Sequence, residues 1–264
     1  MELRPTINRD WLERAAANDP FAHAYGLWDL DHVPNRIRFV SALDGTETVG
    51  YLLVWLGHPT CTVVHWVGSD PRARVLADAL PPRPLVAIVP EMFQDTVVAA
   101  RGPARPSTLL LLAHEPVAPA VRNPPRPSEP ARVRKLERSD HTALVEFAGH
   151  QTDPVAAEYP SLDPGEDWIW GAFVEGRLLG TVRAAVRLPD VWLVGGVFVD
   201  PAARGRGIGQ ALVAAALASA REERVRVGLY VREDRADARR MYDRLGFRPL
   251  GRRTWLDLGA GFAP

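Results

Sequence analysis

The segment that most constrains this 264-residue chain is a strand, a glycine-rich loop and a helix in direct succession. An apolar run at 191–199 is followed by the turn residues Asp200-Pro201, and an alanine-rich helical stretch covers residues 210–221. Such an arrangement leaves backbone N–H groups at a helix start without partners and directs them at an anion. The segment therefore predicts a phosphate or pyrophosphate site. The loop reads Arg204-Gly205-Arg206-Gly207-Ile208-Gly209.

The other common phosphate-binding loops do not fit this segment. A Walker loop continues into Gly-Lys-Ser or Gly-Lys-Thr, and no such tripeptide follows here. A dinucleotide fingerprint has the spacing Gly-x-Gly-x-x-Gly, whereas the glycines of this loop stand at 205, 207 and 209. The pattern that does fit is Arg-x-x-Gly-x-Gly, formed by Arg204, Gly207 and Gly209.

A second pattern lies downstream, where Ala238, Tyr242 and Gly246-Phe247 form Ala-x-x-x-Tyr-x-x-x-Gly-Phe. Between the two patterns, residues 225–231 alternate in polarity, which predicts a strand with one buried face. With both motifs and the order of predicted elements, residues 131–260 resemble the GNAT N-acetyltransferase superfamily. The resemblance implies an α/β (α+β) fold, with a mixed central sheet and flanking helices, and acetyl-CoA as co-substrate.

The resemblance also implies roles for individual residues, and Tyr242 corresponds to the family's general acid. A tyrosine, with a pKa of about 10, is protonated at neutral pH and can give its proton to a thiolate, whose thiol has a pKa of about 8.5. The alternative is a core tyrosine whose hydroxyl bonds any nearby acceptor. Loop and strand-edge backbone groups would bind the pyrophosphate and pantetheine, and one strand N–H would stabilise the oxyanion. The implied cofactor-binding residues are Val197, Phe198, Val199, Arg204, Gly205, Arg206, Gly207, Ile208, Gly209, Gln210 and Arg235.

The chain departs from the family pattern in two places. Arg235 stands where many members have an asparagine, and an arginine cannot accept a hydrogen bond. The strand at 191–199 has no ionisable residue, although many members carry a glutamate there as general base. This absence favours amines of low pKa, or a base acting through water. The remaining candidates for a base are Asp153, Glu158, Asp163, Glu166, Asp167 and His150.

Proline marks the expected domain boundary. Residues 115–130 hold six prolines, a density that removes backbone donors and favours an extended, stiff chain. We therefore predict a linker at 116–130 and a catalytic domain at 131–264. Gly195-Gly196, within the strand before the loop, predicts a bulge or a close approach to the acyl group, with a strand defect filled by a neighbouring tryptophan as the alternative.

The N-terminal half, residues 1–115, echoes the C-terminal half. Residues 36–43 and 48–56 flank a turn at Asp44-Gly45, which predicts a hairpin, and further strands and helices follow in a parallel order. The corresponding loop, Gly68 to Arg74, lacks Arg-x-x-Gly-x-Gly. We interpret this half as a degenerate GNAT-like domain without cofactor binding, which would make two tandem domains. An unrelated α/β domain is the alternative.

Composition excludes several classes of function. The formal net charge is zero, which argues against nucleic-acid or membrane-surface binding through bulk charge. Neither a signal peptide nor a membrane-spanning run is visible, the histidines show no metal-ligand spacing, and the single cysteine, Cys61, suits a reducing cytoplasm. The leading interpretation is acyl transfer, most simply of acetyl, to a primary amine of a small molecule or peptide. A non-catalytic acyl-CoA binder and a protein-interaction module are the alternatives.

Overall fold

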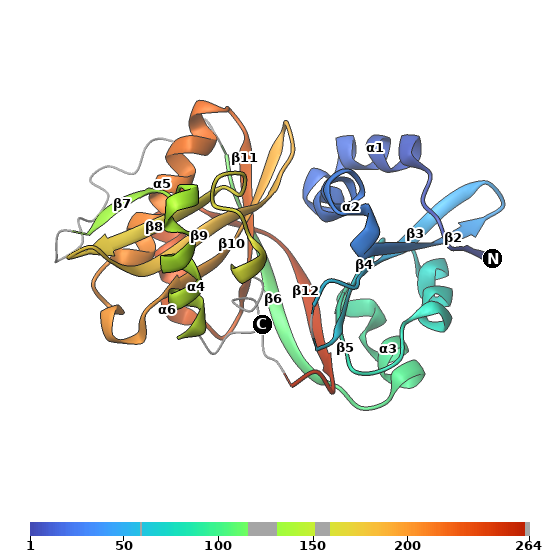
Figure 1. The fold of residues 1–264 in the computed structure, drawn as a ribbon. Coiled ribbons are helices and arrows are strands. Elements are labelled where there is room, and N and C mark those ends of the chain that lie inside the picture. Colours follow the sequence, from blue (N-terminus) through green and yellow to red (C-terminus); the bar gives the residue numbers. More distant parts are fainter. Residues whose placement is uncertain (59, 116–130, 151–158, 262–264) are drawn as a thin grey trace. The chain divides into compact units, whose positions relative to one another are not determined.

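The computed structural model describes residues 1–58, 60–115, 131–150 and 159–261 of the chain, so the predicted linker at 116–130 lies outside them. The described chain divides into two compact units, whose elements are labelled in Figure 1. The first unit comprises Met1–Leu111, Val231–Asp234 and Leu250–Pro264. The second unit comprises Leu112–Tyr230 and Arg235–Pro249.

The first unit contains an antiparallel run of strands followed by one parallel pair, β4 with β5. Two helices begin with side-chain caps, because Asn8 accepts from the Trp11 N–H and Asp19 accepts from the Ala22 N–H. The predicted hairpin is present, and residues Pro71–Ala79 form a 3₁₀ helix. The elements are β1 (Glu2–Arg4), α1 (Arg9–Asn18), α2 (Pro20–His32), η1 (Pro34–Arg36), β2 (Ile37–Asp44), β3 (Glu47–Trp55), β4 (Thr62–Val67), η2 (Pro71–Ala79), β5 (Leu85–Val89), η3 (Glu91–Phe93), α3 (Gln94–Arg101) and β6 (Arg105–His114).

Alternation along the strands gives the first unit two packed faces. On one face, residues of α1 and α2 pack against Phe39, Tyr51 and Leu53. On the other face, residues of η2 and α3 pack against the intervening positions, among them Leu52 and Trp66. Because successive strand residues point to opposite sides, one hydrophobic run such as that of β3 serves both cores.

The second unit repeats the order of strand, helix, hairpin, strand, helix and strand. Its strands β7 to β10 are antiparallel neighbours, and β10 pairs with β11 in parallel. Helix α5 packs against β8, β9 and β10. The elements that follow β6 along the chain are β7 (Arg132–Lys135), η4 (Arg138–Asp140), α4 (His141–Gly149), β8 (Ile169–Val174), β9 (Arg177–Arg187), β10 (Val191–Val199), η6 (Pro201–Ala203), α5 (Ile208–Glu222), β11 (Arg226–Arg232), α6 (Ala236–Arg244) and β12 (Arg248–Leu258).

The last strand of the chain, β12, is exchanged into the first unit. β12 follows α6, yet it pairs with β5 of the first unit over Thr254–Leu258 and contributes Leu256 and Leu258 to that core. The segment Leu250–Pro264, expected within the domain at 131–264, therefore belongs to the first compact unit. The stability of a strand depends on the neighbours against which its side chains pack, so local sequence does not reveal which sheet receives it.

Candidate active site

The parallel pair of β10 and β11 separates soon after it begins. The register runs from Val191↔Arg226 to Leu193↔Gly228, although β10 continues to Val199 and β11 to Arg232. Along β10 the residues up to Val194 are buried, and those from Gly195 onward are only partly buried. The second half of β10 therefore has backbone groups on its β11 side that this register leaves unpaired.

The direction of those groups follows from the pairing on the other side of β10. Asp200 N–H donates to the Leu179 carbonyl of β9 at 2.8 Å, so Asp200 and Phe198 direct their backbone groups toward β9. The intervening residues, Val197 and Val199, direct theirs to the opposite, open side. Of the three strand residues expected at the cofactor, Val197 and Val199 thus have backbone groups that face the opening.

The glycine loop lies directly after this strand. Gly205 and Gly207 both have positive φ, 78° and 81°, a conformation in which a Cβ would be strained. Gly207 is the N-cap of α5 and makes no side-chain cap, so the first N–H groups of this helix receive no hydrogen bond from that position. Open space surrounds the Cβ position of Gly205. These observations fit the pyrophosphate of coenzyme A, which would bind through backbone N–H groups and the positive helix end.

Arginine and glutamine side chains complete the loop. Arg204 Nε donates to the Val199 carbonyl at 3.2 Å, which ties the loop to the end of β10. Gln210 is buried within the first turn of α5, as is Ile208, whereas Arg206 is partly exposed. Arg204 thus orders the strand end, and Arg206 adds a second positive charge to the loop.

The two sequence patterns meet at Gly209. A Cβ added there would lie 3.5 Å from Val199 Cγ2 and 3.6 Å from Met241 Sδ. Met241 precedes Tyr242, so α6 packs beside the loop and the open end of β10. The strand, the glycine loop and the tyrosine helix are therefore neighbours in the second unit.

Tyr242 lies on α6, and its side chain is 6% exposed. Its ring contacts the Phe247 ring edge-on at 5.6 Å, and Phe247 N–H donates to the Tyr242 carbonyl at 3.0 Å. Gly246, with φ 91°, makes the turn that brings Phe247 back to the helix. Burial raises the pKa of Tyr242 to about 12, opposed by the charge of Arg235. Tyr242 therefore stays protonated throughout the physiological range.

Arg235 is the N-cap residue of α6 and forms an ion pair with Asp237, with Nε to Oδ1 at 3.3 Å. Its side chain is half exposed. The charge of the guanidinium thus acts on the pKa of Tyr242. The Arg235 side chain makes no hydrogen bond that caps α6.

The described carboxylates that were candidates for a general base form contacts within a surface turn. Asp163 accepts the Gly165 N–H and pairs with Arg138 at 2.9 Å, which holds the pKa of its carboxyl below the usual value. Asp167 accepts the Asp163 N–H at 2.8 Å, and Glu166 is exposed beside Arg138. These contacts are structural. Asp153 and Glu158 lie outside the described residues, and His150 is exposed at the end of α4.

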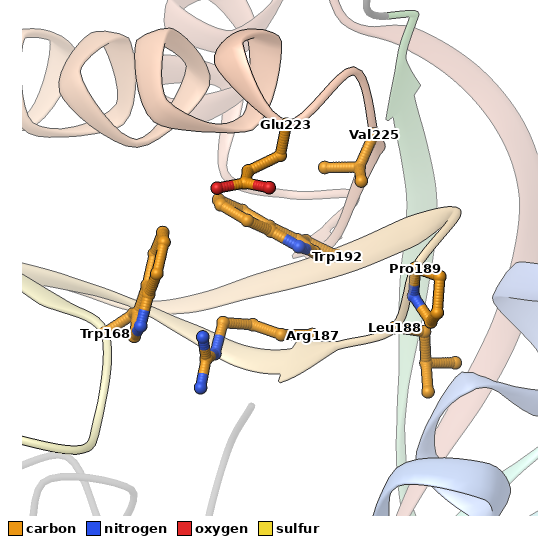
Figure 2. A pocket seen from close by; sticks show the side chains of 7 residues that line it. All are labelled: Trp168, Arg187, Leu188, Pro189, Trp192, Glu223 and Val225. Carbon is orange, nitrogen blue, oxygen red and sulfur yellow. The ribbon is translucent and has the colours of Figure 1, made fainter.

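A pocket of about 250 Å³, shown in Figure 2, lies at the C-terminal end of α5, where Glu223 lines it. Trp168 and Trp192 meet in it edge-on at 5.1 Å. Lys135 Nζ lies 3.8 Å from the Trp168 ring centroid, and Arg187 Cζ lies 4.6 Å from it. Because the protein's own cations already contact this aromatic wall, we assign the pocket no ligand. Its lining is Trp168, Arg187, Leu188, Pro189, Trp192, Glu223 and Val225.

The first unit differs at the position that corresponds to the glycine loop. Asp70 caps η2 by accepting the Arg72 N–H at 2.8 Å, just as Asp200 caps η6 by accepting the Ala202 N–H at 2.9 Å. The units differ after this turn, because no Arg-x-x-Gly-x-Gly loop follows Asp70. The parallel pair of β4 and β5 is in register over Thr62–His65, which is most of β4.

Two site residues carry no motif and were missed in the sequence. Tyr159 and Thr181 are fully buried, and both lie within hydrogen-bonding distance of the Gly196 carbonyl. Gly195-Gly196 was predicted to mark a bulge, and the register of β10 with β9 shifts between Gly195 and Phe198. The aromatic residue against this glycine is Tyr159, rather than a tryptophan.

The described part of the chain contains no cluster of three or more potential metal ligands. Among the helices it describes, none has the length and apolarity needed to cross a bilayer.

The fold is that of the GNAT acyltransferases, and solved structures of this class superpose on nearly the whole chain. A GCN5-related N-acetyltransferase from Sphaerobacter thermophilus has a TM-score of 0.66 at 19% identity, covering 97% of this chain and 94% of its own. A tandem GNAT protein from the clavulanic acid biosynthesis pathway has a TM-score of 0.62 at 19% identity, covering 100% and 99%. The predicted fold class, with two GNAT-like domains in tandem, is confirmed.

At the level of sequence, residues 131–247 match the model of the acetyltransferase (GNAT) family. A mycothiol acetyltransferase from Actinosynnema mirum is 35% identical over 167 residues, covering 57% of this chain and 55% of the relative. The chain therefore matches little more than half the length of this curated relative.

Proposed function

We propose that this chain transfers an acetyl group from acetyl-CoA to a primary amine of a small molecule. The observation that carries the proposal is the open side of β10 next to the glycine-capped start of α5. One site thereby offers an extended strand edge for the pantetheine arm of acetyl-CoA and N–H groups for its diphosphate. The family match of residues 131–247 supports acetyl as the transferred group.

The reaction joins the amine nitrogen to the thioester carbonyl carbon and breaks the carbon–sulfur bond. The amine loses a proton, and the departing thiolate gains one. Val197 N–H, which faces the opening, is our candidate donor to the carbonyl oxygen as negative charge develops on it. Val199 and the loop from Gly205 to Gln210 would hold the co-substrate along the strand and at its diphosphate.

Tyr242 is our candidate donor to the leaving sulfur. With its pKa raised to about 12, complete proton transfer to a thiolate of pKa about 8.5 is uphill by about 5 kcal/mol. Hydrogen-bond donation from the neutral phenol carries no such cost and still stabilises developing thiolate charge. The Arg235 charge lowers the pKa of Tyr242 and so assists the transfer.

The acceptor amine would be one of low pKa. β10 contains no ionisable side chain, and the described carboxylates near Asp163 are engaged in a surface turn. At pH 7 an α-amine with a pKa of about 8 has about 200 times more free base than a lysine with a pKa of about 10.4. A site without its own base therefore selects for the weaker base.

The similarity to mycothiol acetyltransferases supports a small-molecule acceptor rather than a peptide. The match covers only part of both chains, so the acceptor itself is a matter for experiment. We expect a panel of small amines, dipeptides with free N-termini and lysine side-chain amines to rank by amine pKa at pH 7. Comparable rates for lysine ε-amines and α-amines would contradict the inference that the site has no general base of its own.

Thiol release from acetyl-CoA with this panel tests the function directly. We expect Tyr242→Phe to lower kcat about 10- to 100-fold while acetyl-CoA affinity by calorimetry stays unchanged. Tyr51→Phe, which removes a buried hydroxyl in the first unit, is the matched control and should keep full activity. Binding of acetyl-CoA without turnover of any amine would instead favour the non-catalytic binder, and no binding would favour the interaction module.

A further inference from the structure

The bulge in β10 places one peptide group in a special position. Gly195 and Phe198 are three positions apart along β10, but their partners on β9, Arg183 and Thr181, are only two positions apart. β10 therefore has one extra residue here, and Gly196 is left-handed with φ 60°. A glycine in this conformation is typical of a bulge that redirects the strand. The Gly196 carbonyl therefore has no partner in the regular hydrogen-bond pattern of the sheet and needs another donor.

The buried Tyr159 hydroxyl supplies that donor, and a second buried hydroxyl, that of Thr181, lies beside it. The Tyr159 hydroxyl donates to the Gly196 carbonyl at 3.0 Å and lies 3.2 Å from Thr181 Oγ1. Thr181 Oγ1 itself lies 3.5 Å from the same carbonyl. Both side chains are 0% exposed, so water does not compete for these contacts. The Tyr159 ring also packs against Phe198, with centroids 5.8 Å apart.

The anchored carbonyl and the Val197 N–H belong to the same peptide group. In a planar trans peptide, C=O and N–H point in opposite directions, so fixing the Gly196 carbonyl fixes the Val197 N–H. The carbonyl points to Tyr159 and Thr181, and the N–H points away from them. A hydrogen bond to the oxygen also polarises the N–H and strengthens it as a donor.

We propose that Tyr159 is a positioning residue that, with Thr181, orients the Val197 N–H toward the acetyl carbonyl oxygen. The catalytic part of this inference rests on the proposed acetyl transfer, but the anchoring of the peptide group does not. Substituting Tyr159 by phenylalanine keeps the ring packing and removes only the hydroxyl. Thr181 then remains at 3.5 Å, too far to hold the carbonyl in one orientation.

The anchoring is tested in the ligand-free protein. The ¹³C signal of the Gly196 carbonyl reports hydrogen bonding to its oxygen, and we expect Tyr159→Phe to shift this signal and the Val197 amide signal. The matched control is Tyr51→Phe, because Tyr51 is also 0% exposed and its hydroxyl bonds His23 Nδ1 at 3.2 Å in the first unit. Unchanged Gly196 and Val197 signals in Tyr159→Phe would overturn the proposal.

The positioning role is tested by the kinetics. We expect Tyr159→Phe to lower kcat about 10- to 100-fold with little change in KM for acetyl-CoA, since misdirecting one oxyanion donor acts on the transition state. Thr181→Val should lower kcat less, and Thr181→Ser should restore it. A loss confined to KM, or an equal loss in Tyr51→Phe, would refute positioning. A wild-type protein inactive on every amine would refute the proposed function, while the carbonyl signal would still decide the anchoring.

Discussion

Replacing Gly196 by alanine probes the crowded side of the bulge. Gly196 has φ 60°, and an added Cβ would lie 2.3 Å from the Tyr159 hydroxyl oxygen. A side chain in the left-handed region costs about 1 kcal/mol, and pushing a buried hydroxyl from its partners costs about 2 kcal/mol more. We therefore expect Gly196→Ala to lower the free energy of unfolding by about 3 kcal/mol.

Gly45→Ala separates the backbone cost from the steric cost. Gly45 has φ 61°, and nothing lies within 4 Å of an added Cβ. Its substitution incurs only the conformational penalty, about 1 kcal/mol. The difference between the two alanine variants is then a measure of the clash with Tyr159.

A double-mutant cycle completes the test. Without the hydroxyl, the nearest ring atom to the Gly196 Cβ is Cζ of residue 159 at 3.4 Å, which is close to ordinary contact. Tyr159→Phe alone should cost about 1.5 kcal/mol, and the double variant about 2.5 rather than about 4.5 kcal/mol. Urea denaturation measures all three values. Additive costs would show that the hydroxyl does not fill this space, and the reasoning would fail.

The phosphate loop and Tyr242 give two further predictions. Gly207→Ala adds a Cβ at φ 81° beside the open N–H groups, and we expect acetyl-CoA affinity measured by calorimetry to fall at least about tenfold. Gly45→Ala should leave that affinity unchanged. Because burial raises the pKa of Tyr242 to about 12, the folded protein keeps this proton between pH 10 and 12 while the unfolded chain loses it. Stability should therefore decline by up to about 3 kcal/mol as pH rises through this window, and Tyr242→Phe should remove that part of the decline in denaturation series.

The elements that carry the site were predictable from sequence because their signals are local. A few neighbouring residues are enough to determine the conformation of each element. This applies to the apolar run of β10, the glycines at 205 and 207 and the alanine-rich helix. The same holds for Tyr242 and Gly246-Phe247, whose turn depends on one positive φ angle. Confirmation of the GNAT fold shows that these short patterns were sufficient to define the class.

What the sequence could not reveal depends on distant partners. Tyr159 lies 37 residues from Gly196, and no spacing rule links a buried tyrosine to a glycine carbonyl on another strand. The exchange of β12 has the same origin. Its alternating residues suit either sheet, and its place beside β5 is settled by packing of Leu256 and Leu258 in the first core. Pairing of this kind is a property of the folded chain rather than of a window of sequence.

The two units differ in the backbone groups that the proposed anion site requires. In the second unit, three of the nine residues of β10 pair with β11, and the following helix starts at a glycine without a side-chain cap. In the first unit, four of the six residues of β4 pair with β5, and no Arg-x-x-Gly-x-Gly loop follows the Asp70 cap. The first unit thus pairs more of the backbone of its strand, whereas the second leaves more of it unpaired. Pairing the strand further and omitting the glycine loop removes both features that the proposed anion site needs, the extended edge and the uncapped helix start.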